Sequence, residues 1–78
     1  MVSDPYAASA ALVTQLRESG LSVWAQKIED IVQGGSTATE ILMGLRWTLR
    51  ELLHVPTLSP EVAGVASAIL ESVDQLLR

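Results

Sequence analysis

The sequence has no cysteine and no phenylalanine, and it contains one histidine, one tyrosine and two tryptophans in 78 residues. The absence of cysteine excludes disulfide bonds and thiolate metal sites. With so few aromatic side chains, any core must be built mainly from Leu, Ile, Val and Ala. The apolar share of 49% is too high for a disordered segment, so the composition predicts a small folded domain covering residues 1–78.

Basic residues are also scarce, with five Lys and Arg against nine Asp and Glu, for a net charge of −4. Nucleic-acid binding depends on clustered basic side chains that contact phosphates. Lys27 is the only lysine, and the one basic pair, Arg46 and Arg50, is followed by Glu51. The charge pattern therefore disfavours nucleic acid as a partner. An acidic surface suits a basic partner, although −4 is also ordinary for solubility.

Long hydrophobic runs are missing. The N-terminus lacks the basic and apolar regions of a secretory signal, and no stretch approaches the roughly 20 apolar residues that span a bilayer. The most apolar run, residues 62–70, is interrupted by Ser67. These features predict a cytosolic protein that does not insert into membranes.

Capping residues and apolar periodicity predict four helices, at about residues 5–19, 22–33, 38–53 and 60–77. Asp4-Pro5 and Ser59-Pro60 each combine an N-cap residue with a proline at the first helical position. Thr37 and Glu40 have the spacing of a capping box, and Ser22 is a candidate cap for the second helix. Glycines at 20, 34 and 35 are expected to end the first two helices.

Each predicted helix carries an apolar stripe, and the fourth carries two. Because the connections are short, the helices should pack antiparallel, which predicts an all-α, compact antiparallel four-helix bundle. The second stripe on the last helix indicates either a third helix neighbour or self-association. The stripes consist of Trp24, Ile28 and Ile31; Leu42, Leu45, Leu49 and Leu52; Val62, Val65, Ile69, Val73 and Leu76; and Ala63, Ala66, Leu70 and Leu77.

Residues suited to catalysis or metal binding are few. His54 is the only candidate base near neutral pH, and it falls at a predicted helix end, where a cation also complements the helix dipole. Glu29 and Asp30 are adjacent, so on a helix they diverge by about 100° and do not chelate one ion. Residues 34–37 precede a helix but lack the lysine of a phosphate-binding loop. We therefore predict no enzyme activity, no metal site and no cofactor.

The third predicted helix has more apolar surface than one core needs. Met43 and Trp47 lie four residues apart beside the leucine stripe, and Arg46 and Arg50 border them. Trp, Met and Arg are enriched at protein interfaces, so these residues are candidate protein-binding residues. The alternative is that Trp47 closes one edge of the core. Gly44 should allow close approach by a neighbouring helix or by a partner.

Part of the chain resembles a group of small helical bacterial proteins, some of which are immunity proteins of toxin systems. The resemblance covers about residues 12–53 and implies a cytosolic protein that sequesters a cognate toxin. It assigns no binding residue, because such proteins use different surfaces for different toxins. The residues that carry it are Gly20, Trp24, Ala25 and Ile28, the run from Gly34 to Ile41, and the run from Gly44 to Trp47.

Two functions remain open from the sequence. The first is an immunity or antitoxin-type module that occludes the active site of a toxin, with acidic residues such as Glu29 and Asp30 facing a basic cleft. The second is a homodimerisation or structural module without catalytic activity. A DNA-binding helix-turn-helix is disfavoured, because the third helix would present Glu40 and apolar groups where phosphate and base contacts are needed.

Overall fold

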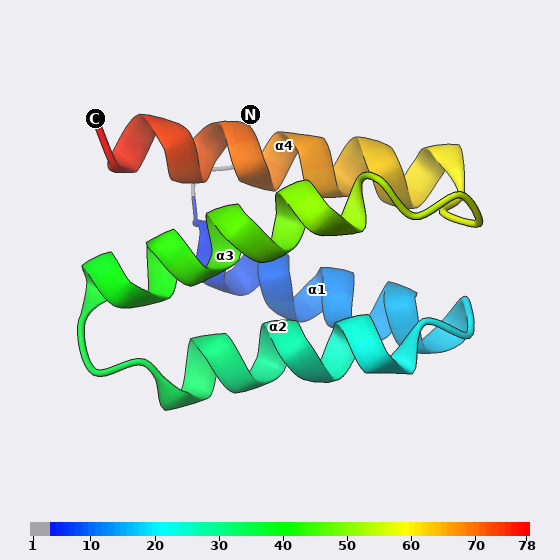
Figure 1. Ribbon diagram of the computed structural model, residues 1–78, viewed down its shortest axis with the longest axis horizontal. Helices are drawn as coiled ribbons and strands as arrows, with labels where there is room; N and C mark the ends of the chain where they lie inside the picture. Colours follow the sequence, from blue (N-terminus) through cyan, green and yellow to red (C-terminus); the bar gives the residue numbers. More distant parts are fainter. Residues whose placement is uncertain (1–3) are drawn as a thin grey trace.

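The computed structural model describes residues 4–78, which form four α-helices (Figure 1). Helix α1 spans Pro5–Glu18, α2 spans Ser22–Gly34, α3 spans Ala38–Leu52 and α4 spans Pro60–Leu76. The predicted all-α fold is confirmed, and each predicted helix end differs from the observed one by no more than one residue. No strand occurs among residues 4–78.

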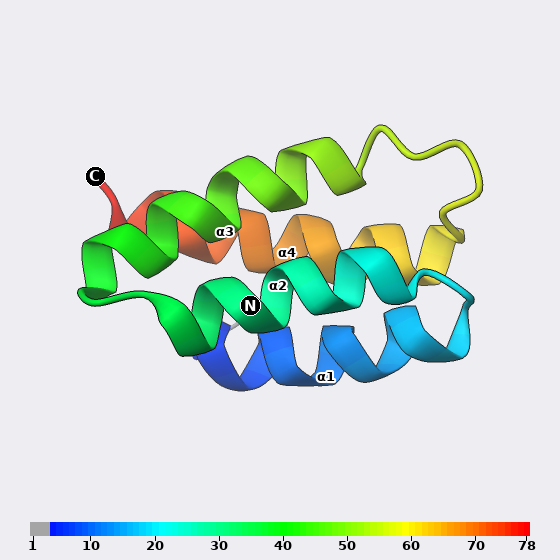
Figure 2. The ribbon, with the colours of Figure 1, turned by 60° about the horizontal axis from the view of Figure 1, so that its bottom comes forward.

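Successive helices run antiparallel and occupy the four corners of a bundle (Figures 1 and 2). α1 packs on α2 and α4, and α3 packs on the same two helices from the opposite corner, while the backbones of diagonal helices stay farther apart. The radius of gyration is 11.3 Å, close to the roughly 11.5 Å expected for a compact chain of this length. Every helix therefore has two neighbours and one face left to solvent.

The N-caps predicted for α1 and α4 are present. The Asp4 carboxylate accepts hydrogen bonds from the backbone N–H groups of Tyr6 and Ala7, at 3.0 and 3.3 Å. The Ser59 hydroxyl accepts from the N–H of Val62 at 3.3 Å. Each cap is followed by a proline, whose missing N–H leaves one fewer donor unsatisfied in the first turn.

Half of the predicted capping box at α3 is formed. The Thr37 hydroxyl accepts a hydrogen bond from the Glu40 N–H at 3.1 Å. In the described chain, the Glu40 carboxylate does not bond back to the Thr37 N–H. Glu40 still stabilises the helix start, because a negative charge in the first turn complements the helix dipole.

The prediction that Ser22 caps α2 is wrong. Gly20 has a φ of 78°, in the left-handed region, and its N–H bonds to the Arg17 carbonyl. The N–H of Leu21 reaches the Leu16 carbonyl at 2.8 Å, which completes a Schellman ending of α1. The turn is so tight that Leu21 is already the N-cap of α2, and Ser22 becomes its first helical residue.

The leucine stripe of α3 forms the centre of the core. Leu45, Leu49 and Leu52 have no exposed surface, and Leu42 is 8% exposed, as the periodicity predicts. These side chains meet buried residues from the other three helices. Those residues are Leu12, Val13 and Leu16 of α1, Ala25 and Ile28 of α2, and Val62, Ala66, Ile69 and Val73 of α4.

The buried line of α4 differs from the predicted seam. Ala66 is fully buried where Val65 was expected, and Leu76 is 57% exposed. The buried line takes Val62, Ile69 and Val73 from the first stripe and Ala66 from the second. Other members of both stripes, Val65, Leu70 and Leu77, pack partly buried beside this line, where α4 meets α1 and α3. A third helix neighbour is therefore unnecessary to explain the double stripe, and the bundle itself accounts for most of it.

Ser9 is a polar residue in the core that the sequence patterns did not indicate. It is 1% exposed, and its hydroxyl has no hydrogen-bond partner in the structure. A buried hydroxyl without a partner costs about 1–3 kcal/mol relative to its hydration in the unfolded chain. Ser9 therefore reduces the stability of the bundle.

We predict that Ser9→Ala raises the free energy of unfolding by about 1 kcal/mol more than Ser67→Ala does. Ser67 is an exposed residue within α4, so its replacement reports the helix propensity difference alone. Urea denaturation followed by circular dichroism measures both. Equal effects of the two substitutions would show that the Ser9 hydroxyl is satisfied in solution.

Candidate protein-interaction surface

The outer face of α3 exposes two large apolar side chains. Trp47 is 64% exposed and Met43 is 50% exposed. Trp47 lies two residues from both Leu45 and Leu49, and two residues turn a helix by about 200°. Because those leucines point into the core, Trp47 must point away from it. The interpretation of Trp47 as an edge of the core is therefore wrong.

We call this face the α3 patch. It is the solvent-facing side of α3 and has Met43 and Trp47 at its centre and charged side chains around them. Arg46 is partly buried, and the other members are exposed. The residues of the α3 patch are Glu40, Met43, Arg46, Trp47, Arg50 and Glu51.

A groove between α2 and α3 borders the α3 patch. Its volume is about 470 Å³, and it is lined by Lys27, Asp30 and Ile31 of α2 and by Gly44, Trp47 and Thr48 of α3. A Cβ atom on Gly44 would lie 2.9 Å from Cγ2 of Ile31. The expected close approach at Gly44 is thus made by α2, and the missing side chain of Gly44 opens the groove floor.

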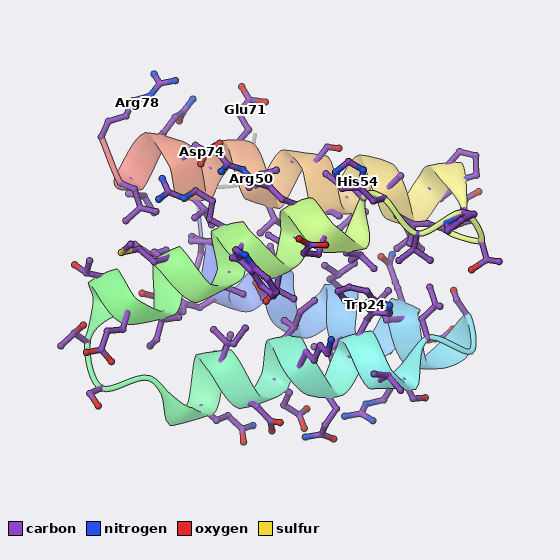
Figure 3. The ribbon with its side chains drawn as sticks, in the orientation of Figure 1. Trp24, Arg50, His54, Glu71, Asp74 and Arg78 are labelled. Carbon is purple, nitrogen blue, oxygen red and sulfur yellow. The ribbon has the colours of Figure 1, made fainter. Side chains whose placement is uncertain are left out.

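The charges around Trp47 are divided between two sides. Arg50 points toward α4, where its Nη2 lies 3.8 Å from Oδ1 of Asp74 (Figure 3). Asp30 lies across the groove on α2, and its carboxylate accepts a hydrogen bond of 2.8 Å from the Gln26 side chain. The ion pair of Arg50 is weak, because that side chain is 59% exposed. Arg50 remains accessible to a partner.

Glu29, which was predicted together with Asp30, lies on a different surface. Its carboxylate is 3.3 Å from the guanidinium of Arg17 on α1. The two acids are neighbours in sequence, so the helix separates them by about 100° and directs Glu29 toward α1. The structure thus groups Asp30 with the four predicted residues of α3 and leaves Glu29 out.

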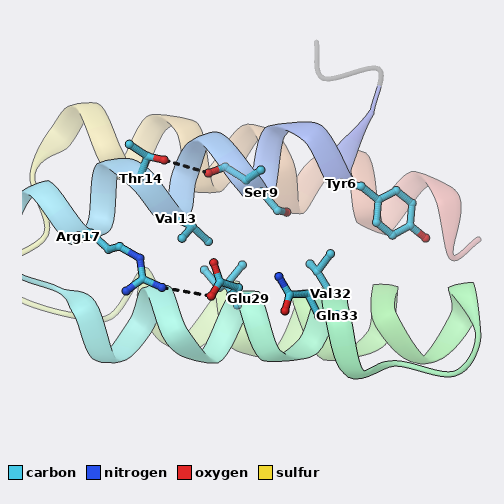
Figure 4. Close-up of a pocket in the computed structure, with 10 residues that line it drawn as sticks. Tyr6, Ser9, Val13, Thr14, Arg17, Glu29, Val32 and Gln33 are labelled. Carbon is cyan, nitrogen blue, oxygen red and sulfur yellow. Dashed lines mark hydrogen bonds and ion pairs between the residues drawn. The ribbon is translucent and has the colours of Figure 1, made fainter.

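A second cavity, of about 230 Å³, lies between α1 and α2 (Figure 4). Tyr6, Val13 and Val32 provide apolar walls, and the Arg17–Glu29 pair lies at its edge. Ser9 also lines this cavity, yet its hydroxyl oxygen is sealed from solvent. The exposed side chains of Thr14 and Gln33 complete the lining, so the cavity is a partly polar surface depression with one exposed ion pair.

Trp24 packs partly buried against the core, as its stripe predicted. The ammonium of Lys27 lies 4.6 Å from the centre of its ring, a cation–π contact one helical turn along α2. This contact is not among the features predicted from the sequence, although the spacing of three residues could have indicated it. Lys27 is thereby held at the edge of the groove.

The residues described include no group of three or more His, Asp or Glu side chains placed to hold a metal ion. His54, the candidate base, is exposed just after the end of α3 (Figure 3). Over residues 4–78, no helix is long and apolar enough to cross a membrane. No protein-family model, curated protein or solved structure matches this chain.

We predict opposite effects of alanine at two mid-helix glycines. Gly64→Ala should raise the free energy of unfolding by about 1 kcal/mol, because nothing lies near a Cβ atom there and alanine favours the helix. Gly44→Ala should lower it, because the new methyl group meets the β-branched Ile31 and α2 must shift. Thermal and urea unfolding of both variants measure the difference.

A stabilised Gly44→Ala variant would show that α2 and α3 separate without cost. The double variant Gly44→Ala, Ile31→Ala distinguishes the two explanations. If contact with Ile31 is the cause, Gly44→Ala should be less destabilising in the Ile31→Ala background than in the wild type.

Proposed function

We propose that this chain is a protein-binding module and that it binds its partner through the α3 patch. The observation that carries the proposal is the 64% exposure of Trp47 on a helix whose opposite face already fills the core. Tryptophan is among the residues most enriched at the energetic centre of protein interfaces. The exposed position of the Trp47 side chain on this small bundle therefore favours a role in partner recognition over a role in folding.

The surroundings of Trp47 fit such a role. Met43 widens the apolar centre, and its flexible side chain adapts to an irregular partner surface. Charged side chains border this centre, which matches the usual pattern of an apolar interface core and a polar rim. The groove beside Trp47 can receive a side chain from the partner. The buried leucine stripe fixes α3 in the bundle, and α3 presents the apolar centre and the charged rim on its outer face.

The resemblance of residues 12–53 to immunity proteins supplies one class of partner, a bacterial toxin. Under this proposal the module acts in the cytosol and neutralises the toxin by covering its active site. Glu40 and Glu51 of the patch and Asp30 across the groove, all exposed, would then approach a basic cleft and accelerate the encounter. The apolar centre of the patch would supply the affinity.

We expect Trp47→Ala to weaken partner binding about thirtyfold or more, the loss typical of an interface hot spot. Its free energy of unfolding should change little, because the removed side chain is mostly exposed. Leu76→Ala is the matched control, since Leu76 is 57% exposed on α4 and points about 200° around that helix from Asp74, the residue beside Arg50. This control should bind as the wild type does.

Site-specific photo-cross-linking in the cells of origin provides the measurement. A photoreactive residue at Met43 should give a cross-linked protein adduct, which mass spectrometry identifies, and Trp47→Ala should abolish it. The same residue at Ser67, exposed on α4, is the control position. If Met43 gives no more adduct than Ser67, the proposed function is wrong.

A further inference from the structure

The cavity between α1 and α2 shares no residue with the α3 patch and has a lining of its own kind. Its apolar wall includes Val13 of α1 and Val32 of α2. The ring of Tyr6 lies at one end of the cavity, and the Arg17–Glu29 ion pair lies at the other (Figure 4). The lining therefore has an apolar middle between an aromatic end and a charged end.

Ser9 adds a polar group on the inner side of this cavity. The residue is 1% exposed, and its hydroxyl has no hydrogen-bond partner. Its side chain projects from α1 toward α2, between Val13 and Tyr6 (Figure 4). Alanine would fill this helical position without the cost of a buried, unsatisfied hydroxyl. A residue that conflicts with stability in this way is expected where it serves binding instead.

The volume of the cavity limits the size of a ligand. It is about 230 Å³. An apolar cavity of about 150 Å³ can hold benzene, whereas pockets for drug-sized ligands start at about 300 Å³. The cavity can therefore hold one aromatic ring with a small substituent, and it is too small to enclose a nucleotide or another ligand of several rings.

The charges of the lining favour an uncharged ligand. Among the described residues, only Arg17 and Glu29 bring charge to the cavity, and they pair with each other at 3.3 Å. A carboxylate that approaches Arg17 also meets Glu29, and an ammonium that approaches Glu29 also meets Arg17. The remaining polar side chains of the lining, Ser9, Thr14 and Gln33, are uncharged. A ring with a hydroxyl group would leave the ion pair intact and give Ser9 a partner.

We propose that this cavity binds a small uncharged phenol, with its ring between Val13 and Val32 and its hydroxyl bonded to the hydroxyl of Ser9. The Ser9 oxygen is covered in the free chain, and a turn about its single χ1 torsion gives the hydroxyl other staggered positions from which to reach the ligand. The ring gains from burial against the valines and from contact with the ring of Tyr6. The proposal does not depend on the α3 patch or on its partner.

Phenol itself is the probe, and toluene is its match in shape without the hydroxyl. Titration into ¹⁵N-labelled protein, followed by NMR of the backbone amides, should give saturable shifts along the cavity and a Kd for phenol of about 1 mM, as expected for an efficient ligand of this size. Benzoate, which adds a negative charge to the same ring, should not saturate.

Ser9→Ala tests the hydrogen bond. This variant should bind phenol at least about fivefold more weakly than the wild type, the loss expected for one hydrogen bond. Its affinity for toluene should be unchanged or higher, because toluene makes no bond to Ser9. The variant is expected to fold, since it removes a buried hydroxyl that has no partner.

A blocking variant tests the position of the ligand. Ala10 lines the cavity and is exposed, so Ala10→Leu extends a larger side chain over the cavity without entering the core. It should weaken phenol binding at least about tenfold and keep the helical circular dichroism of the wild type. Ala11→Leu makes the same change at an exposed position of α1 outside the cavity, and it should bind phenol as the wild type does.

Three results would overturn the proposal. The first is a wild type whose amide signals show no saturable shift with phenol up to about 10 mM. The second is an unchanged phenol affinity of Ser9→Ala, and the third is an equal effect of Ala10→Leu and Ala11→Leu. None of these results bears on the cross-link at Met43, which tests the proposed function separately.

Discussion

Burial of the leucine stripe of α3 is the constraint on which the rest of the structure depends. Leu45, Leu49 and Leu52 are completely enclosed, and a helix can turn only one face toward its core. Once these leucines point inward, the rotation of α3 about its axis is fixed. The chain has no disulfide to hold it instead, so the same packing both stabilises the bundle and directs Trp47 outward.

Much of the fold could be predicted because its signals are local. Asp4, Thr37 and Ser59 act on backbone groups two or three residues away, and the leucine spacing of α3 needs only the helical period. The cap at Ser22 could not be predicted in this way. The Schellman ending of α1 depends on the hydrogen bond from Leu21 to Leu16, and this left no residue between the turn and α2.

The candidate site was harder to predict than the helices. The sequence places Met43 and Trp47 on one apolar stripe, but whether a stripe is buried depends on how many neighbours the helix has. The number of neighbours becomes evident only from the structure, in which α3 packs side by side with α2 and α4 and its outer face meets no other helix. The separation of Glu29 from Asp30 has the same origin, because it depends on which helix packs beside α2.

The contact between Gly44 and Ile31 has a consequence for the evolution of the fold. The two positions share one volume, so their sizes are coupled although 13 residues separate them in the chain. A lineage that gains a side chain at position 44 can keep the helix spacing only by losing atoms at position 31. The groove beside Trp47 would narrow in the same step, so residue 44 links the packing of the bundle to the shape of its exposed surface.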